Sequence, residues 1–160
     1  MEDDIRLPVD VLRAPPSLDN LEGAALGQVD VSVTPLQMVM AAASLSNGGS
    51  LPVPQLVTAF QDADGNWVIM PPEGEPSQVL PATDADRTAN YLAVMGEQWW
   101  QSLAVSPNGP EQTVSWFLGG SLPNEDPTSL QMAIALVLEE DNVAAAQEIG
   151  QSVLKQALLP

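Results

Sequence analysis

The sequence of 160 residues contains neither cysteine nor histidine. Without cysteine there is no disulfide framework and no thiolate metal site. Without histidine, the Ser-His-Asp and Cys-His arrangements, the usual zinc sites and the commonest general base are all excluded. Acid–base chemistry would have to depend on carboxylates, Tyr91 or Lys155. We therefore expect no metal and no cofactor.

Basic residues are also scarce. The chain has four of them and 21 acidic residues, which gives a formal net charge of −17. Such a charge repels phosphate backbones and anionic membrane surfaces, so we expect no nucleic-acid partner. This net negative charge fits either an acidic surface exposed to solvent or the binding of a cationic partner. No stretch approaches the roughly 20 apolar residues of a membrane-spanning helix. The acidic start, Met1 to Asp4, also lacks the basic and then apolar pattern of a secretory signal.

A hydrophobic fraction of 45% is that of a folded chain, and the length fits one domain. Residues 1–30 are rich in proline and acidic residues and show no sustained periodicity, so we interpret them as an extended lead-in. Residues 31–160 are expected to form the folded domain.

The clearest local signal is Thr34-Pro35-Leu36-Gln37, which has the pattern of a capping box with proline in the first helical turn. The helix that follows is predicted to bury the stripe Leu36, Val39, Met40 and Ala43 and to end at Asn47-Gly48-Gly49.

The middle of the chain predicts a β-hairpin, with strands 56–60 and 67–70 around the turn 62–66. Residues 71–82 contain four prolines and are expected to be loop. A second helix is predicted from about Thr83 to Glu97, with Tyr91, Leu92 and Met95 facing inward.

The last third is predicted to form strands at 100–105 and 113–118 around a turn at 107–110, then a buried central strand at 130–138. A final helix, capped by Asp141, is expected to present a mostly apolar face. Its inward residues would be Val143, Gln147, Gly150, Val153, Leu154 and Leu158. The predicted class is α+β, with an antiparallel sheet flanked by helices.

Several of these segments resemble the penicillin-binding transpeptidase family. Gly27-Gln28, then Thr34-Pro35 with Gln37, then the Asn-Gly-Gly end, follow that family's G-Q, V-T-P-L-Q-M and N-G-G order. Trp116-Phe117-Leu118-Gly119 resembles its W-F-x-G strand. The resemblance implies the C-terminal portion of a transpeptidase domain, a partial fold of the penicillin-binding and serine β-lactamase type.

The family's catalytic motifs are what we expect to be missing. Its S-x-x-K and S-x-N precede the G-Q segment, so this chain is expected to begin after them, with no catalytic residue. Its K-T-G belongs on the strand before W-F-x-G, at about Ser102, Leu103 and Ala104. No lysine or arginine occurs between residues 90 and 115, so the cation that binds substrate carboxylate in the family has no counterpart there.

Other chemical interpretations are weaker than structural ones. The 62–66 segment lacks ligands of an EF-hand loop and is interpreted as a β-turn. The pair Trp99-Trp100 is expected to pack, and the acidic run 139–141 to support the helix that follows. Ser102 has no base nearby in the sequence and is expected to be an ordinary strand serine.

Three functional hypotheses follow. The first is a non-catalytic transpeptidase-like domain that serves as a scaffold or interaction module, which by resemblance places it in a cell-wall, extracytoplasmic context. The second is the C-terminal segment of a genuine D,D-transpeptidase whose serine lies outside this chain. The third is an acidic module that binds a basic protein. Because the family's central helix and first strands have no counterpart here, we expect a protein partner, a homo-oligomer or a rearranged fold.

Overall fold

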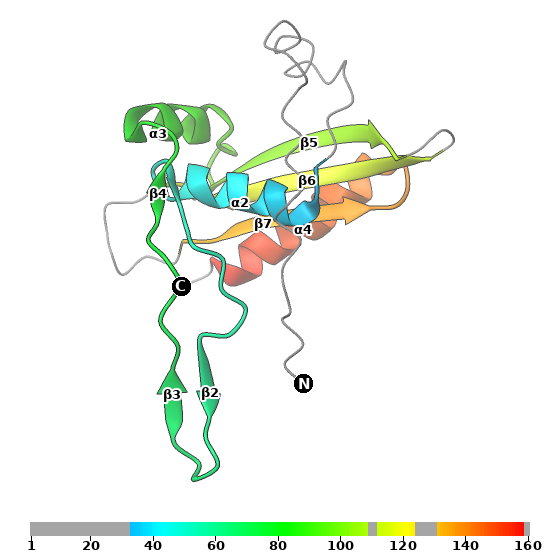
Figure 1. Ribbon diagram of the computed structural model, residues 1–160. Coiled ribbons are helices and arrows are strands. Elements are labelled where there is room, and N and C mark those ends of the chain that lie inside the picture. Colours follow the sequence, from blue (N-terminus) through cyan, green and yellow to red (C-terminus); the bar gives the residue numbers. More distant parts are fainter. Residues whose placement is uncertain (1–32, 109–111, 124–130, 159–160) are drawn as a thin grey trace, which may run out of the picture.

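The computed structural model describes residues 33–108, 112–123 and 131–158 (Figure 1). These residues form three helices and seven strands. In chain order they are α2 (Pro35–Ser46), β1 (Ser50–Leu51), β2 (Ala59–Gln61), β3 (Trp67–Ile69), β4 (Ser77–Gln78), α3 (Ala82–Tyr91), β5 (Trp99–Pro107), β6 (Thr113–Ser121), β7 (Ala133–Leu138) and α4 (Val143–Ala157). The α+β class is confirmed. The expected lead-in, Gly27 and Gln28 lie outside the described residues.

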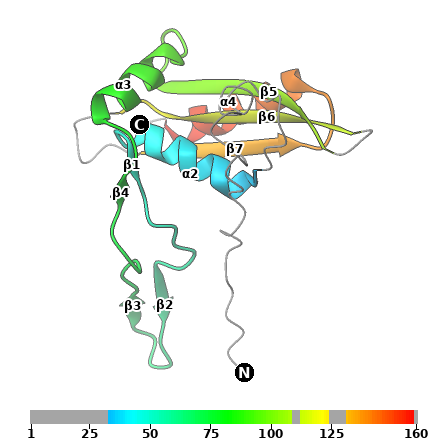
Figure 2. The same cartoon turned by 45° about the horizontal axis from the view of Figure 1, so that its top comes forward.

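A three-stranded antiparallel sheet in the order β5-β6-β7 forms the centre of the molecule. Its register pairs Ser102 with Leu118 and Leu103 with Phe117. Helices α2 and α4 cover its opposite faces, and α3 packs beside α2 (Figures 1 and 2). Side chains alternate along each strand, so every strand contributes residues to both faces.

Helix α2 begins at the predicted capping box. The Thr34 hydroxyl accepts from the Gln37 amide at 3.2 Å, and the Gln37 side chain accepts from the Thr34 amide at 2.9 Å. Gly48 and Gly49, with φ of 56° and 83°, carry the chain out of the helix in the left-handed region that glycine adopts without strain. Both ends of this helix are therefore as the sequence predicts.

The side of α2 that is buried differs from the prediction. The stripe from Leu36 through Val39 and Met40 to Ala43 is only half-buried, whereas the last turn is buried. The buried residues there are Ala42, Ser44, Leu45 and Ser46. The helix is apolar nearly all round, so periodicity alone does not select one face.

The core between the sheet and α4 centres on Phe117, which is fully buried with Trp99, Ala146 and Leu154. Two glycines allow this close packing. A Cβ on Gly119 would lie 2.9 Å from Leu154 Cδ1, and a Cβ on Gly150 would meet the Phe117 ring. The W-F-x-G pattern and the C-terminal helix thus fit each other across this face.

The core on the α2 face centres on Trp100, which packs against Ala42 and Leu45 of α2 and against Ala85 and Ala89 of α3. Its indole N–H donates to the buried Ser46 hydroxyl at 3.0 Å. A Cβ on the neighbouring Gly120 would meet that same Ser46 hydroxyl oxygen. The expectation that the tryptophan pair packs is confirmed, with the two rings on opposite faces of the sheet.

Several predicted details of the helices and strands were wrong. Helix α3 ends at Tyr91, and Tyr91 and Met95 are 88% and 98% exposed rather than inward. Strand β7 is a half-buried edge of the described sheet, because β6 occupies the centre. Helix α4 is capped by Asn142, whose side chain accepts from the Ala145 amide at 3.0 Å, and not by Asp141. Val153 is exposed on α4.

The predicted hairpin forms, as β2 and β3, at the end of a projection from the body of the molecule (Figures 1 and 2). We call residues 52–76, between β1 and β4, the arm. Strands β1 and β4 pair at its base through Ser50 with Gln78, and β4 lies inside the stretch 71–82 that was expected to be loop. Of the helices in the described residues, none has the length and apolar character to cross a bilayer.

Candidate functional site

The candidate site lies on β5, the strand that carries the K-T-G position in the resemblance. Its residues alternate between the faces of the sheet. Leu103 packs into the core under α4, and Gln101 also faces α4, where its side-chain oxygen accepts from Gln151 at 3.0 Å. Ser102 and Ala104 therefore point toward the α2 face, where Ser102 is half-buried and Ala104 exposed. The three residues do not converge on one point.

The backbone of β5 is the other component of the site. One edge pairs with β6 along the whole strand. On the other edge, the start of the strand is bonded to the preceding loop, by the bridge Ala93–Trp100 and by the Gln101 amide to the Leu92 carbonyl at 3.2 Å. From Ser102 to Pro107 no strand of the described residues pairs with this edge. An edge of this kind can take an added extended segment.

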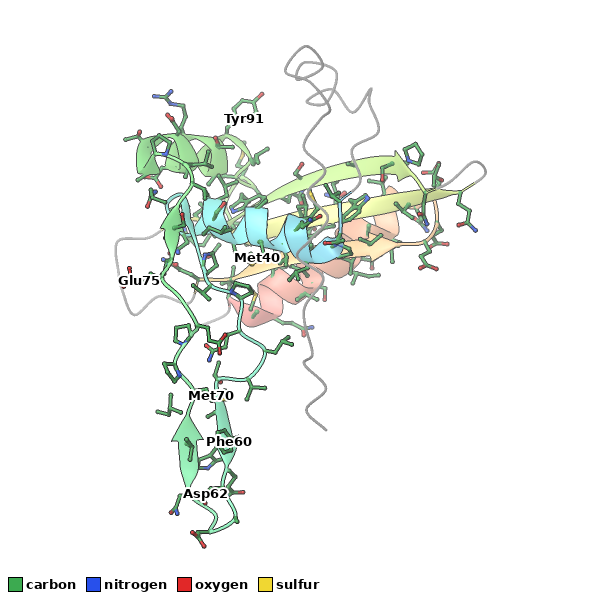
Figure 3. The ribbon with its side chains drawn as sticks, in the orientation of Figure 1. Met40, Phe60, Asp62, Met70, Glu75 and Tyr91 are labelled. Carbon is green, nitrogen blue, oxygen red and sulfur yellow. The ribbon has the colours of Figure 1, made fainter. Side chains whose placement is uncertain are left out.

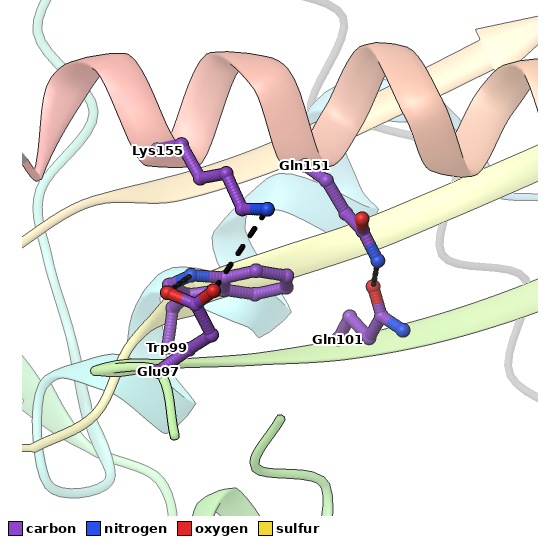
Figure 4. Close-up of polar contacts among 5 residues, drawn as sticks. All are labelled: Glu97, Trp99, Gln101, Gln151 and Lys155. Carbon is purple, nitrogen blue, oxygen red and sulfur yellow. Dashed lines mark hydrogen bonds and ion pairs between the residues drawn. The ribbon is translucent and has the colours of Figure 1, made fainter. Parts of the chain in front are cut away.

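Positive charge is absent from this part of the strand. The described residues contain two basic side chains, Arg87 on α3 and Lys155 on α4. Lys155 Nζ lies 3.8 Å from Glu97 Oε1, and Glu97 also accepts from the Trp99 indole at 3.3 Å (Figure 4). Both partners of the ion pair are more than a third exposed, so its contribution to stability is at most about 1 kcal/mol. The pair belongs to the α4 face.

One S-x-x-K spacing does occur, at Ser152-Val153-Leu154-Lys155, and sequence reasoning missed it. It lies late in α4 instead of ahead of α2. Leu154 is fully buried against the sheet, so Ser152, two residues away on the helix, points outward and is exposed. Lys155 approaches Glu97, and Ser152 and Lys155 share no hydrogen bond. Ser152 and Lys155 therefore lie on the outer surface of α4, away from the exposed side of β5.

The remaining motif residues have structural roles. Trp116 donates from its indole to the Ser106 hydroxyl at 2.9 Å, on the α2 face. Phe117 and Gly119 make the contact with α4, and Thr34, Pro35 and Gln37 begin α2. The hydrogen bonds made by these motif residues, at the Trp116 indole and in the capping box, therefore serve packing or capping.

The acidic hairpin turn is explained by local structure, and the run 139–141 takes part in the contact that precedes α4. The Asp62 carboxylate accepts from the amides of Asp64 and Asn66 at 3.0 and 2.8 Å, which makes the hairpin turn. The Asn66 amide is the main cause that lowers the pKa of Asp62 below its ordinary value of 3.8. In the acidic run 139–141, the Glu140 carbonyl accepts from the Ser115 hydroxyl at 2.9 Å, next to the start of α4. No cluster of residues that could hold a metal ion occurs in the described ranges.

Comparison with solved structures connects this geometry to known proteins. The chain is similar to penicillin-binding protein A from M. tuberculosis in its imipenem acyl-enzyme complex, with a TM-score of 0.73 and 22% identity over 90% of this chain. It is also similar to the D,D-transpeptidase domain of a peptidoglycan glycosyltransferase from Eggerthella lenta, with a TM-score of 0.58 and 26% identity over 79% of this chain. A third similarity, to M. tuberculosis penicillin-binding protein 3 complexed with aztreonam, has a TM-score of 0.61 and 17% identity.

The chain has the fold of part of a penicillin-binding transpeptidase domain. It spans about a third of the length of these neighbours, 35% for penicillin-binding protein A and 33% for the Eggerthella lenta domain. No family model matches the sequence, and no curated protein matches it. The resemblance drawn from the motifs is thus confirmed at the level of the fold, while the strand that would carry K-T-G has Leu103 turned into the core.

Proposed function

We propose that this chain is a non-catalytic transpeptidase-like domain that serves as a scaffold or interaction module in a cell-wall context, on the extracytoplasmic side of the envelope. The observation that carries the proposal is the composition of β5. Where the resemblance calls for a cation, the strand offers a half-buried serine, a core leucine and an exposed alanine. Neither basic side chain of the described residues lies on this strand.

The packing around β5 supports a scaffold. A transpeptidase serine needs an adjacent base for activation. Among the described residues no base is hydrogen-bonded to Ser102, and the Ser106 hydroxyl accepts from the Trp116 indole. In contrast, the packing residues of the motifs are retained, since Phe117, Gly119 and the capping box all make close contacts. The chain has the motif residues that pack the fold and lacks the K-T-G cation. We expect this combination in a domain whose fold has a structural role.

A β-lactam tests this proposal on the full 160-residue chain. We expect intact-mass spectrometry after incubation with excess imipenem to detect no covalent adduct, and the thermal unfolding midpoint to stay unchanged, because a ligand that binds the native state raises it. An acyl adduct would overturn the proposal. Ser102→Ala and Ser152→Ala variants would then identify whether the β5 serine or the S-x-x-K serine of α4 had reacted.

The second candidate is the C-terminal segment of a genuine D,D-transpeptidase whose nucleophile lies outside this chain. The observation in its favour is the fold similarity over only about a third of the length of the neighbours. Acylation of a natural protein that carries an S-x-x-K upstream of this segment, at that serine, would support it. That protein would then be acylated with Ser102 and Leu103 unchanged, so a lysine at the K-T-G position would not be required for the reaction.

A further inference from the structure

The arm exposes an unusual amount of apolar surface. Half of the exposed large hydrophobic side chains in the described part of the chain, seven of 14, belong to these residues 52–76. They are Leu56, Val57, Phe60, Trp67, Val68, Ile69 and Met70. The largest exposed fractions are 80% for Ile69 and 71% for Trp67. Exposed apolar side chains gathered on one segment in this way are typical of sites of protein interaction.

Both faces of the hairpin contribute to this surface. Phe60 pairs with Val68 on one face, and Trp67 and Ile69 lie on the other. The hairpin extends away from the sheet, with Phe60, Asp62 and Met70 along it, so the described body does not cover it (Figure 3). A two-stranded hairpin alone is marginally stable in water, and the strands have only three residues each. A partner that packs on the arm would stabilise it.

The negative charge of the arm indicates which class of partner it can bind. It carries Asp62, Asp64, Glu73 and Glu75 and no lysine or arginine. A second copy of the chain would bring another net charge of −17, which opposes association. Anionic lipids and nucleic acids are disfavoured for the same reason. Carboxylates next to exposed apolar side chains complement a protein segment in which apolar residues are combined with lysine or arginine.

We propose that the arm is a docking site for an apolar and basic segment of a partner protein. This inference rests on the proposed role as an interaction module and assigns that role to a surface. An extended segment that packs its apolar side chains on Trp67 and Ile69 and continues along the arm toward the body would bring its cations toward Glu73 and Glu75, between the hairpin and β4. The partner's charges would set the association rate and selectivity, and its apolar side chains most of the affinity.

Trp67 provides a reporter, because the other three tryptophans are buried or half-buried. The probe is a short synthetic peptide of alternating lysine and valine, added to the full chain. We expect a blue shift of the tryptophan emission, protection from acrylamide quenching, and weaker binding in added salt. Peptides with glutamate in place of lysine, or serine in place of valine, should bind at least about tenfold more weakly.

Matched variants, measured by calorimetry, test the location. Ile69→Ser should weaken binding about tenfold, whereas Met95→Ser, which alters an even more exposed apolar residue away from the arm, should leave it unchanged. Glu73→Gln with Glu75→Gln should weaken it about threefold and reduce its salt dependence, unlike Glu139→Gln with Asp141→Asn. Equal melting curves would show that all variants remain folded.

Three outcomes would overturn the docking site. The first is equal weakening by the control variants, which would show that binding is not specific to the arm. The second is equal binding of the glutamate peptide, and the third is self-association in sedimentation experiments that Ile69→Ser abolishes. None of these outcomes changes the result with imipenem. An acyl adduct together with arm-dependent peptide binding would remove only the proposal of a non-catalytic domain.

Discussion

The contact between Gly150 and Phe117 leads to a prediction in which two effects oppose each other. Gly150→Ala in α4 would ordinarily stabilise the helix by about 1 kcal/mol, because alanine loses less backbone entropy than glycine. Here the added Cβ would meet three carbon atoms of the Phe117 ring, far inside the ordinary contact distance of about 3.5–4.0 Å. The ring is fully buried in a cluster with Trp99, Ala146 and Leu154, so it has little room to move.

Overpacking a buried site costs about 1–3 kcal/mol, and occasionally more. Because this contact is severe and involves a pinned ring, we expect the clash to exceed the helix propensity gain. Gly150→Ala should lower the free energy of unfolding by about 1–2 kcal/mol. For a chain of this size, that corresponds to a fall of about 2–8 °C in the thermal midpoint.

Thermal and urea unfolding followed by circular dichroism would measure the change. The matched control is Ser152→Ala, on the exposed side of the same helix, which should raise stability by about 0.5 kcal/mol. A Phe117→Leu background should reduce the cost of Gly150→Ala, since the two positions are in contact. If Gly150→Ala instead raised the midpoint as Ser152→Ala does, the packing of α4 on the sheet described above would be wrong.

Two further predictions concern the α2 face and the arm. Ser46→Ala would leave the buried Trp100 indole N–H without its acceptor and should cost about 1–3 kcal/mol in urea unfolding; a loss as small as that for an exposed serine would contradict the assigned bond. The pKa of Asp62 is lowered, mainly by the Asn66 amide, so its contribution to the turn is present above the ordinary pKa of 3.8 and is lost as the pH falls through the lower folded value. The Asn66 amide resonance should therefore titrate with a midpoint below 3.8 and stop titrating in Asp62→Asn, and a midpoint at or above 3.8 would disprove the assigned bond.

The sequence predicted best where the signal is local. The capping box at Thr34 and Gln37 and the left-handed glycines after α2 depend on groups within a few residues of one another, and both ends of the helix were predicted correctly. The hairpin turn at Asp62 belongs to the same class. Motif order was also informative, since it indicated the transpeptidase fold where no family model matches.

Burial was predicted less well, because it depends on what packs against each element. The inward placement of Tyr91 and Met95 was wrong, since α3 uses the small residues Ala85 and Ala89 to approach α2. The buried turn of α2 was missed for a similar reason. That helix has apolar residues on all sides, and the choice is made by Trp100, which lies 54 residues beyond Ser46.

For the candidate site, the sequence alone determined the absence of cysteine and histidine and of any lysine or arginine between residues 90 and 115, since these are matters of composition and order. Only the tertiary structure decided that Leu103 belongs to the core under α4, that Ser152 and Lys155 of α4 point outward, and that the arm projects with its apolar residues exposed. The physical reason is that a strand has two faces and a helix several. Residue types limit the chemistry available, but contacts between distant segments decide which side chains share a surface.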